Sequence, residues 1–205
     1  MALSGLFMIL FLLGHLSGNL LIYAGPEAIN TYAETLRKFP AALWGFRIVT
    51  LLAIVMHVWT AIKLTRRNRA AMPVSYNSNQ WKGSTWSSRN MGLTGLVILL
   101  YVIYHLAHFT WRNAHPEMFA GVGEFDAYQM IVISFSQTWL AVLYVVAMFI
   151  LSLHLSHSVS SAVQTLGINH PKYNLAIRRI GDIVAIGLFF GFSSIPVGVM
   201  LGLIK

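Results

Sequence analysis

Eight histidines occur in this chain of 205 residues, and six of them lie inside long apolar stretches. These six are His15, His57, His105, His108, His154 and His157. An ionisable side chain within a membrane-spanning helix is costly, and such a residue is a candidate functional group. Because neutral imidazole nitrogens bind metal ions readily, the six residues are candidate ligands of a metal-containing cofactor.

Four of these histidines fall at two matched depths. Counted from the nearer end of their apolar stretches, His15, His57, His105 and His154 lie seven to nine residues deep. At the helical rise per residue this is roughly 10–14 Å. Because successive spans run in opposite directions, His15 shares one layer with His105, and His57 shares the other with His154. Two histidines at one depth suit the axial positions of a haem iron, and two haems at different depths can carry electrons across a bilayer.

Small residues near His15 favour the same interpretation. Gly14 and Gly18 bracket this histidine and remove bulk where a porphyrin could approach the backbone. The same G-x-x-x-G spacing is also common where membrane helices simply pack on each other. A zinc ion usually takes clustered ligands at one depth, whereas these histidines are paired at two. A lone histidine in an apolar helix is often only a core residue, but four on successive helices favour haem ligation.

His108 and His157 follow His105 and His154 by three residues, so either could replace its neighbour as the ligand. They lie one turn nearer the membrane faces, where a histidine can hydrogen-bond a haem propionate or a quinone. The simpler interpretation, a polar residue at the membrane interface, is the favoured one.

The elements that position these residues are five apolar stretches. A spanning helix needs roughly 20 mostly apolar residues, and the stretches that qualify are Ala2–Ala24, Ala41–Leu64, Met91–Asn113, Ser136–Ser161 and Arg179–Ile204. Backbone polar groups in lipid must pair within their own segment, which favours helices. The predicted fold is an all-α membrane protein, a single domain over residues 1–205 in which a bundle of five transmembrane helices encloses two haems.

The composition excludes an ordinary soluble domain. The chain is 57% hydrophobic and 10% charged, with a mean hydropathy of +0.66, whereas soluble domains carry about 25% charged residues. The net charge of +8 does not favour nucleic-acid binding, because the basic residues alternate with apolar runs instead of forming one stripe. The chain has no cysteine, which excludes covalent c-type haem attachment and leaves b-type haem. No A-x-A-like site follows the first apolar stretch, so we expect no cleavable signal peptide.

Lys and Arg predict the orientation, because cytoplasmic connections are enriched in both. Nine of the fourteen lie in the second and fourth connections: Lys63, Arg66, Arg67, Arg69, Lys82, Arg89, Lys172, Arg178 and Arg179. The other two connections hold most of the acidic residues, which are Glu27, Glu34, Glu117, Glu124 and Asp126. We therefore expect a cytoplasmic N-terminus and an external Lys205. We also expect the segments Lys63–Arg89 and Gln164–Arg179 to contact partner subunits.

A set of short motifs at specific spacings extends over nearly the whole chain. They are Gly14-His15-Leu16, Gly25-Pro26-Glu27-Ala28-Ile29-Asn30, Glu34-Thr35-Leu36, Met56-His57-Val58, Ser88-Arg89, Thr94-Gly95, Tyr104-His105, Leu153-His154-Leu155-Ser156 and Gly167-Ile168. In these motifs the chain resembles the di-haem cytochrome b membrane anchor of succinate dehydrogenase/fumarate reductase, in the version with one five-helix polypeptide.

The resemblance implies ligation of an outer haem by His15 and His105 and of an inner haem by His57 and His154. It implies a bacterial inner membrane, with a flavoprotein subunit carrying FAD and an iron–sulfur subunit at the cytoplasmic face. Electrons from succinate would reach menaquinone through the inner and then the outer haem. Such anchors often carry an acidic residue near the quinone, in the first external connection. Glu34 fits this proton-donor role best. Glu27 is the second candidate for the proton donor.

Two other interpretations of the function stay open. One is a di-haem cytochrome b anchor of a hydrogenase or formate dehydrogenase, against which the position of His15 on the first helix argues. The other is a histidine-dependent, proton-coupled transporter. Transporters typically show internal repeats and broken helices. Neither is evident here, although Pro196 could kink the fifth helix.

Overall fold

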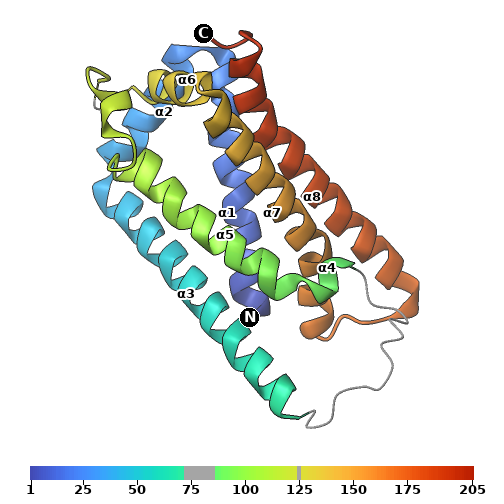
Figure 1. Ribbon diagram of the computed structural model, residues 1–205. Helices are drawn as coiled ribbons and strands as arrows, with labels where there is room; N and C mark the ends of the chain where they lie inside the picture. The colour runs from blue at the N-terminus through green and yellow to red at the C-terminus, as the bar shows by residue number, and fades with distance from the viewer. Residues whose placement is uncertain (72–85, 124–125) are drawn as a thin grey trace.

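The computed structural model describes residues 1–71, 86–123 and 126–205, and in these ranges the chain is helical with no strand (Figure 1). Five segments are long and apolar enough to cross a membrane, which confirms the predicted all-α fold with five spans. They are Ala2–Ala24, Pro40–Ala70, Met91–Thr110, Thr138–Thr165 and Pro171–Met200.

Two of the spans change helix type along their length. The first consists of α1 (Ala2–Asn19) and a 3₁₀ turn, η1 (Leu20–Ala24), and the third of α5 (Met91–His105) and a π-helix, η2 (Leu106–Thr110). The other three spans are single helices: α3 (Pro40–Ala70), α7 (Thr138–Thr165) and α8 (Pro171–Met200).

Several helix ends differ from the limits of the apolar stretches. Helix α3 continues six residues past Leu64, and α8 begins at Pro171, eight residues before the predicted start. Lys and Arg have good helix propensity, so a helix need not end where its apolar residues end. A proline at the first helical position and the His170 ring, which accepts a hydrogen bond from the Lys172 backbone N–H, together start α8. Gly167, at φ 94°, ends α7 in a left-handed conformation that favours glycine.

Short helices connect the spans at the end of the bundle where the C-terminus lies (Figure 1). They are α2 (Pro26–Lys38), η3 (Pro116–Phe119) and α6 (Ala127–Ser136). The Asn30 side chain ties α2 to α6, because its amide donates to Asp126 Oδ1 at 3.0 Å and its carbonyl accepts from the Tyr128 N–H at 3.0 Å. Asp126 also caps α6 by accepting from the Gln129 N–H at 2.9 Å. The first and third connections are therefore one packed layer at this end.

The closest helix packing is between α7 and α8, whereas α3 and α5 bury very little. A Cβ added at Gly181 on α8 would lie 3.1 Å from Val159 Cβ on α7, so the two backbones approach closely there. In contrast, α3 has no buried residue, and Thr94 is the buried residue of α5. Among the described residues, those of α3 are mostly exposed, whereas most of those of α5 are partly buried.

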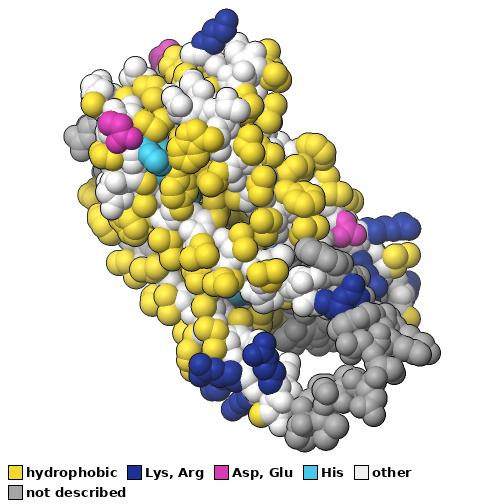
Figure 2. Space-filling model, viewed as in Figure 1, with side chains coloured by type: hydrophobic (Ala, Val, Ile, Leu, Met, Phe, Trp, Pro, Cys, Tyr) yellow, Lys and Arg dark blue, Asp and Glu magenta, His cyan; other side chains and the backbone are white. Residues whose placement is uncertain are grey.

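Charge is distributed unequally between the two ends of the bundle. The basic residues at the end of α3, on α4 (Trp86–Arg89) and at the start of α8 lie at one end. Figure 2 shows most of the visible Lys and Arg side chains toward that end. Glu27, Glu34, Glu117 and Asp126 belong to the connecting layer at the other end. Lys82 and Glu124 lie outside the described residues. The charge asymmetry expected from the sequence is thus an asymmetry of the folded molecule.

Candidate functional site

His15 on α1 and His105 on α5, which were predicted to share the outer layer, face each other. Their ring centroids are 6.0 Å apart, and the ring planes meet at 85°. Two imidazoles that bind one metal from opposite sides have centroids roughly 6 Å apart, because each metal–nitrogen bond is about 2 Å long. The spacing of this pair therefore matches the spacing of two axial ligands.

Aromatic side chains surround this outer pair. Phe11 stacks on the His15 ring at 5.4 Å and 11°, and Phe192 of α8 lies 5.8 Å from it. Phe109 lies 5.6 Å from the His105 ring. Both histidines nevertheless keep part of their surface accessible. An apolar aromatic wall around imidazoles that are not fully enclosed suits a flat, apolar macrocycle.

The inner pair rests on glycines of neighbouring helices. A Cβ added at Gly5 on α1 would lie 3.4 Å from His57 Cε1, and one at Gly95 on α5 would lie 3.4 Å from His154 Cε1. The structure thus brings together the outer histidine pair expected from depth. It also places Gly5, which the sequence did not single out, beside His57.

A serine hydroxyl lies beside one ring nitrogen of His57. Ser4 Oγ donates to the Met1 carbonyl at 2.9 Å and lies 3.4 Å from His57 Nδ1. A hydroxyl has a single hydrogen, and here the shorter bond to the carbonyl uses it. The oxygen therefore accepts from His57 Nδ1–H, and Nε2 keeps its lone pair. This is the tautomer in which a neutral histidine binds a metal through Nε2.

The same arrangement recurs at His154. Its Nδ1 lies 3.0 Å from Thr94 Oγ1, and the Thr94 hydroxyl donates to the carbonyls of Asn90 (3.1 Å) and Met91 (3.3 Å). With its hydrogen directed to either carbonyl, the Thr94 hydroxyl oxygen is left to accept from His154 Nδ1–H. His154 Nε2 is then also free for a ligand.

His108 differs from the four predicted ligands, because both of its ring nitrogens are occupied. Its side chain is fully buried, with Nδ1 3.0 Å from Tyr144 Oη and Nε2 3.2 Å from Ser134 Oγ. Residues of α6 and α7 therefore cover His108, and its position at the membrane interface stays a prediction. His157 is partly exposed on α7, within coulombic range of Arg178. The geometry favours His105 over His108 as the residue opposite His15.

The predicted glycines and acidic residues have different surroundings. An added Cβ at Gly18 would lie 2.7 Å from the Tyr32 ring, so Gly18 has a packing role against α2. A Cβ at Gly14 would meet nothing within 4 Å, which leaves open space beside His15. Glu34 and Glu27 are exposed on α2. No contact in the described part of the chain joins Glu34 to either histidine pair, and its role as a proton donor stays a prediction.

The histidine arrangement can be compared with the ligand requirements of a metal ion and of a haem. In residues 1–71, 86–123 and 126–205, no three His, Cys, Asp or Glu side chains gather as a metal ion held by protein ligands alone would require. Haem iron needs only two axial ligands, since the porphyrin supplies the other four nitrogens. The 6.0 Å spacing of the outer imidazoles and the hydroxyls beside Nδ1 of His57 and His154 are compatible with a haem.

Sequence reasoning missed the hydroxyl groups that hold these histidines. Ser4, Thr94 and Tyr144 lie within apolar spans, and each contacts a histidine of another helix. A polar side chain inside a spanning segment is a usable signal, but its partner depends on how the helices are rotated about their axes.

Comparisons with protein-family models, with curated proteins and with solved structures find no match to this chain. The functional assignment therefore rests on the residues and the geometry described above.

Proposed function

We propose that this protein is the membrane-anchor and electron-transfer subunit of a succinate:quinone oxidoreductase, with two b-type haems. His15 and His105 would hold the outer haem, and His57 and His154 the inner haem. The observation that carries the proposal is the outer pair, whose ring centroids lie 6.0 Å apart from two different helices. When bound, each haem supplies a one-electron carrier, and two at different depths connect the two membrane faces.

The chain contributes binding, orientation and an apolar environment. The hydroxyls of Ser4 and Thr94 orient His57 and His154 and leave their Nε2 atoms available. Phe11 and Phe192 place apolar aromatic rings beside His15. Such contacts affect both ligand basicity and the potential of a bound haem.

The basic end of the bundle supports the remaining parts of the proposal. By the positive-inside rule, the end that carries Lys63, Arg89 and Lys172 faces the cytoplasm of a bacterial inner membrane. The same end would contact an iron–sulfur subunit and a flavoprotein subunit that carries FAD. Menaquinone would react near the outer haem at the opposite end, with Glu34 as the leading proton donor.

The decisive experiment is a haem count on the purified chain. We expect a dithionite-reduced-minus-oxidised spectrum of b type and a pyridine haemochrome value of two haems per chain. His170→Ala is the matched control, because His170 starts α8 outside the two pairs, and this variant should keep both haems. A colourless chain would overturn the proposal and favour a proton-coupled transporter.

A second measurement separates this proposal from a di-haem anchor of a hydrogenase or formate dehydrogenase. Succinate added to native membranes should reduce the haems of the complex. Reduction by hydrogen or formate without reduction by succinate would assign the chain to one of the other two enzymes.

A further inference from the structure

Four side chains form a continuous hydrogen-bonded series that ends on His105. Tyr144 Oη lies 3.5 Å from His105 Nδ1 and 3.0 Å from His108 Nδ1. His108 Nε2 lies 3.2 Å from Ser134 Oγ, and the Ser134 hydroxyl donates to the Met130 carbonyl at 2.7 Å. The series thus begins at a backbone carbonyl of α6 and crosses α7 to reach α5.

The bond to the carbonyl at one end gives one consistent direction for the series. The Ser134 hydroxyl donates its single hydrogen to Met130 O at 2.7 Å. Ser134 Oγ then accepts from His108 Nε2–H, which leaves His108 Nδ1 without a hydrogen. Tyr144 O–H therefore donates to His108 Nδ1, and Tyr144 Oη accepts from His105 Nδ1–H. His105 Nε2 is left with its lone pair.

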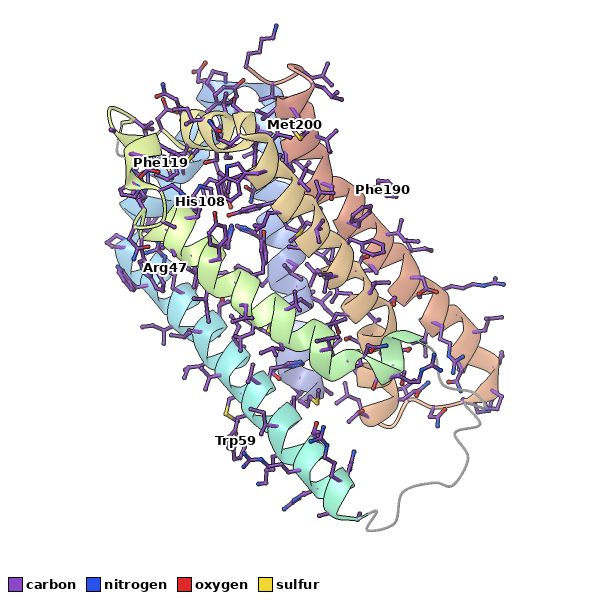
Figure 3. The ribbon with its side chains drawn as sticks, in the orientation of Figure 1. Arg47, Trp59, His108, Phe119, Phe190 and Met200 are labelled. Carbon is purple, nitrogen blue, oxygen red and sulfur yellow. The ribbon has the colours of Figure 1, made fainter. Side chains whose placement is uncertain are left out.

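Three of the four members of the series are enclosed, so water does not replace them. His108 and Ser134 are 0% exposed and Tyr144 is 5% exposed. Phe109 and Phe119 lie 4.3 Å and 5.6 Å from the His108 ring. Figure 3 places His108 and Phe119 toward the same end of the bundle. In such surroundings, a donor or acceptor that loses its partner stays unpaired, and the favoured hydrogen arrangement is strongly determined.

The backbone around His108 is itself unusual. The π-helix η2 (Leu106–Thr110) begins directly after His105 and contains His108. Short π-helical turns are rare and occur frequently at functional sites. Arg112 and His115 follow with φ of 54° and 61°, in the left-handed region that non-glycine residues seldom adopt. The chain therefore departs from regular helix where it places His108 under α6 and α7.

We infer that Tyr144, His108 and Ser134 are positioning residues that keep the hydrogen of His105 on Nδ1 and so hold Nε2 ready for the haem iron. This inference rests on the proposed function, since it assigns the surroundings of the outer haem. In this arrangement Ser134 acts on His105 through His108 and Tyr144.

The inference predicts the sign of a redox effect. A hydrogen bond donated by Nδ1–H increases the basicity of the imidazole, which stabilises ferric iron more than ferrous iron. Loss of that bond should therefore raise the midpoint potential of the outer haem. Mutating such a partner typically changes metal affinity about 10–100-fold. If the affinities for ferric and ferrous iron change by factors that differ tenfold, the midpoint potential shifts by about 59 mV for one electron.

The test uses the full chain purified with its haems and titrated potentiometrically, with low-temperature EPR of the oxidised state. Tyr144→Phe should raise the potential of one haem by about 59 mV, for a tenfold effect, and change its EPR signal, with the other haem unaffected. The affected haem should be the one missing from His105→Ala. Tyr101→Phe is the matched control, because Tyr101 lies 5.9 Å from the His105 ring and makes no hydrogen bond to it in the described part of the chain.

A second pair of variants tests the remote member. Ser134→Ala should shift the same haem in the same direction by a smaller amount, because it removes the acceptor of His108 Nε2–H. Ser134→Thr keeps the hydroxyl and should restore the wild-type potential. If Tyr144→Phe loses both haems through misfolding, the midpoint potentials of Ser134→Ala and Ser134→Thr test the inference. Equal potentials in these two variants would then refute it.

Three results would overturn the inference: equal shifts in Tyr144→Phe and Tyr101→Phe, a shift of both haems, or no shift in Tyr144→Phe. The two proposals fail differently. A wild-type chain without haem refutes the proposed function. If the wild-type chain holds two haems and Tyr144→Phe leaves both midpoint potentials unchanged, only the positioning role is refuted.

Discussion

Replacing Thr94 by valine should weaken binding of the inner haem while leaving the outer haem in place. Valine has nearly the shape of threonine, so the packing of this buried residue (4% exposed) changes little. The change removes Oγ1, which lies 3.0 Å from His154 Nδ1. It also removes the bonds from the hydroxyl to the backbone carbonyls one turn earlier.

Thr50 provides a control for the effect of Thr94→Val on haem affinity. Thr50 Oγ1 on α3 donates to the Phe46 carbonyl at 2.8 Å, so Thr50→Val loses the same kind of backbone bond without affecting a histidine. The difference between the two variants isolates the acceptor of His154 Nδ1–H. A buried donor left without a partner costs about 1–3 kcal/mol. Since about 1.4 kcal/mol is a tenfold change in affinity, this range overlaps the 10–100-fold loss typical of such partners.

The assay is haem binding to the haem-depleted chain in detergent, followed by absorbance as haem is added. We expect two equivalents to bind tightly to wild type and to Thr50→Val. In Thr94→Val, one equivalent should bind about 10–100-fold more weakly, and Thr94→Ser should bind like wild type. Equal binding by Thr94→Val and Thr50→Val would refute the argument that the hydroxyl orients His154.

Three further predictions concern the ligands, the quinone site and the basic end. Alanine at any one of the four ligand histidines should remove one haem from the pyridine haemochrome count, because each imidazole supplies one of two axial bonds, while His108→Ala should keep both. In the intact complex, Glu34→Gln should lower quinone reductase activity but leave haem content and artificial-acceptor activity unchanged; unchanged quinone turnover would move the proton-donor role to Glu27. Lys63 and Lys172 should crosslink to a peripheral subunit, and labelling of both only from the outer face would contradict the orientation and the docking.

The spans and the histidine layers could be predicted because both depend on position along one helix. Hydropathy located all five spans, since a run of about 20 apolar residues is typical of a membrane-spanning helix and uncommon in water-soluble structure. Counting residues from the ends of those spans paired His15 with His105, and their rings do face each other. The helix ends were less predictable, because the basic residues after Leu64 and before Arg179 are compatible with a continuing helix.

The partners of the histidines could not be predicted in the same way. Ser4 is 53 residues from His57, and Thr94 is 60 residues from His154. Such contacts depend on the rotation of each helix about its axis and on the crossing of helix pairs. The burial of His108 depends on α6 and on the π-helix, neither of which has a strong signal in the pattern of apolar residues.

The hydrogen bonds also separate two kinds of buried histidine that the sequence leaves alike. A histidine whose two ring nitrogens both bond within the protein has none left for a metal, as His108 shows with Tyr144 and Ser134. A histidine prepared for a metal has one nitrogen bonded and the other with its lone pair free. His57 and His154 each have Nδ1 beside a hydroxyl that donates to a backbone carbonyl. The inferred series through Tyr144 gives His105 the same arrangement. Three histidines on α3, α5 and α7 therefore share one arrangement, with hydroxyls from α1, α7 and α5 respectively. Because core packing alone gives no reason for the same nitrogen to stay free three times, the recurrence favours ligation.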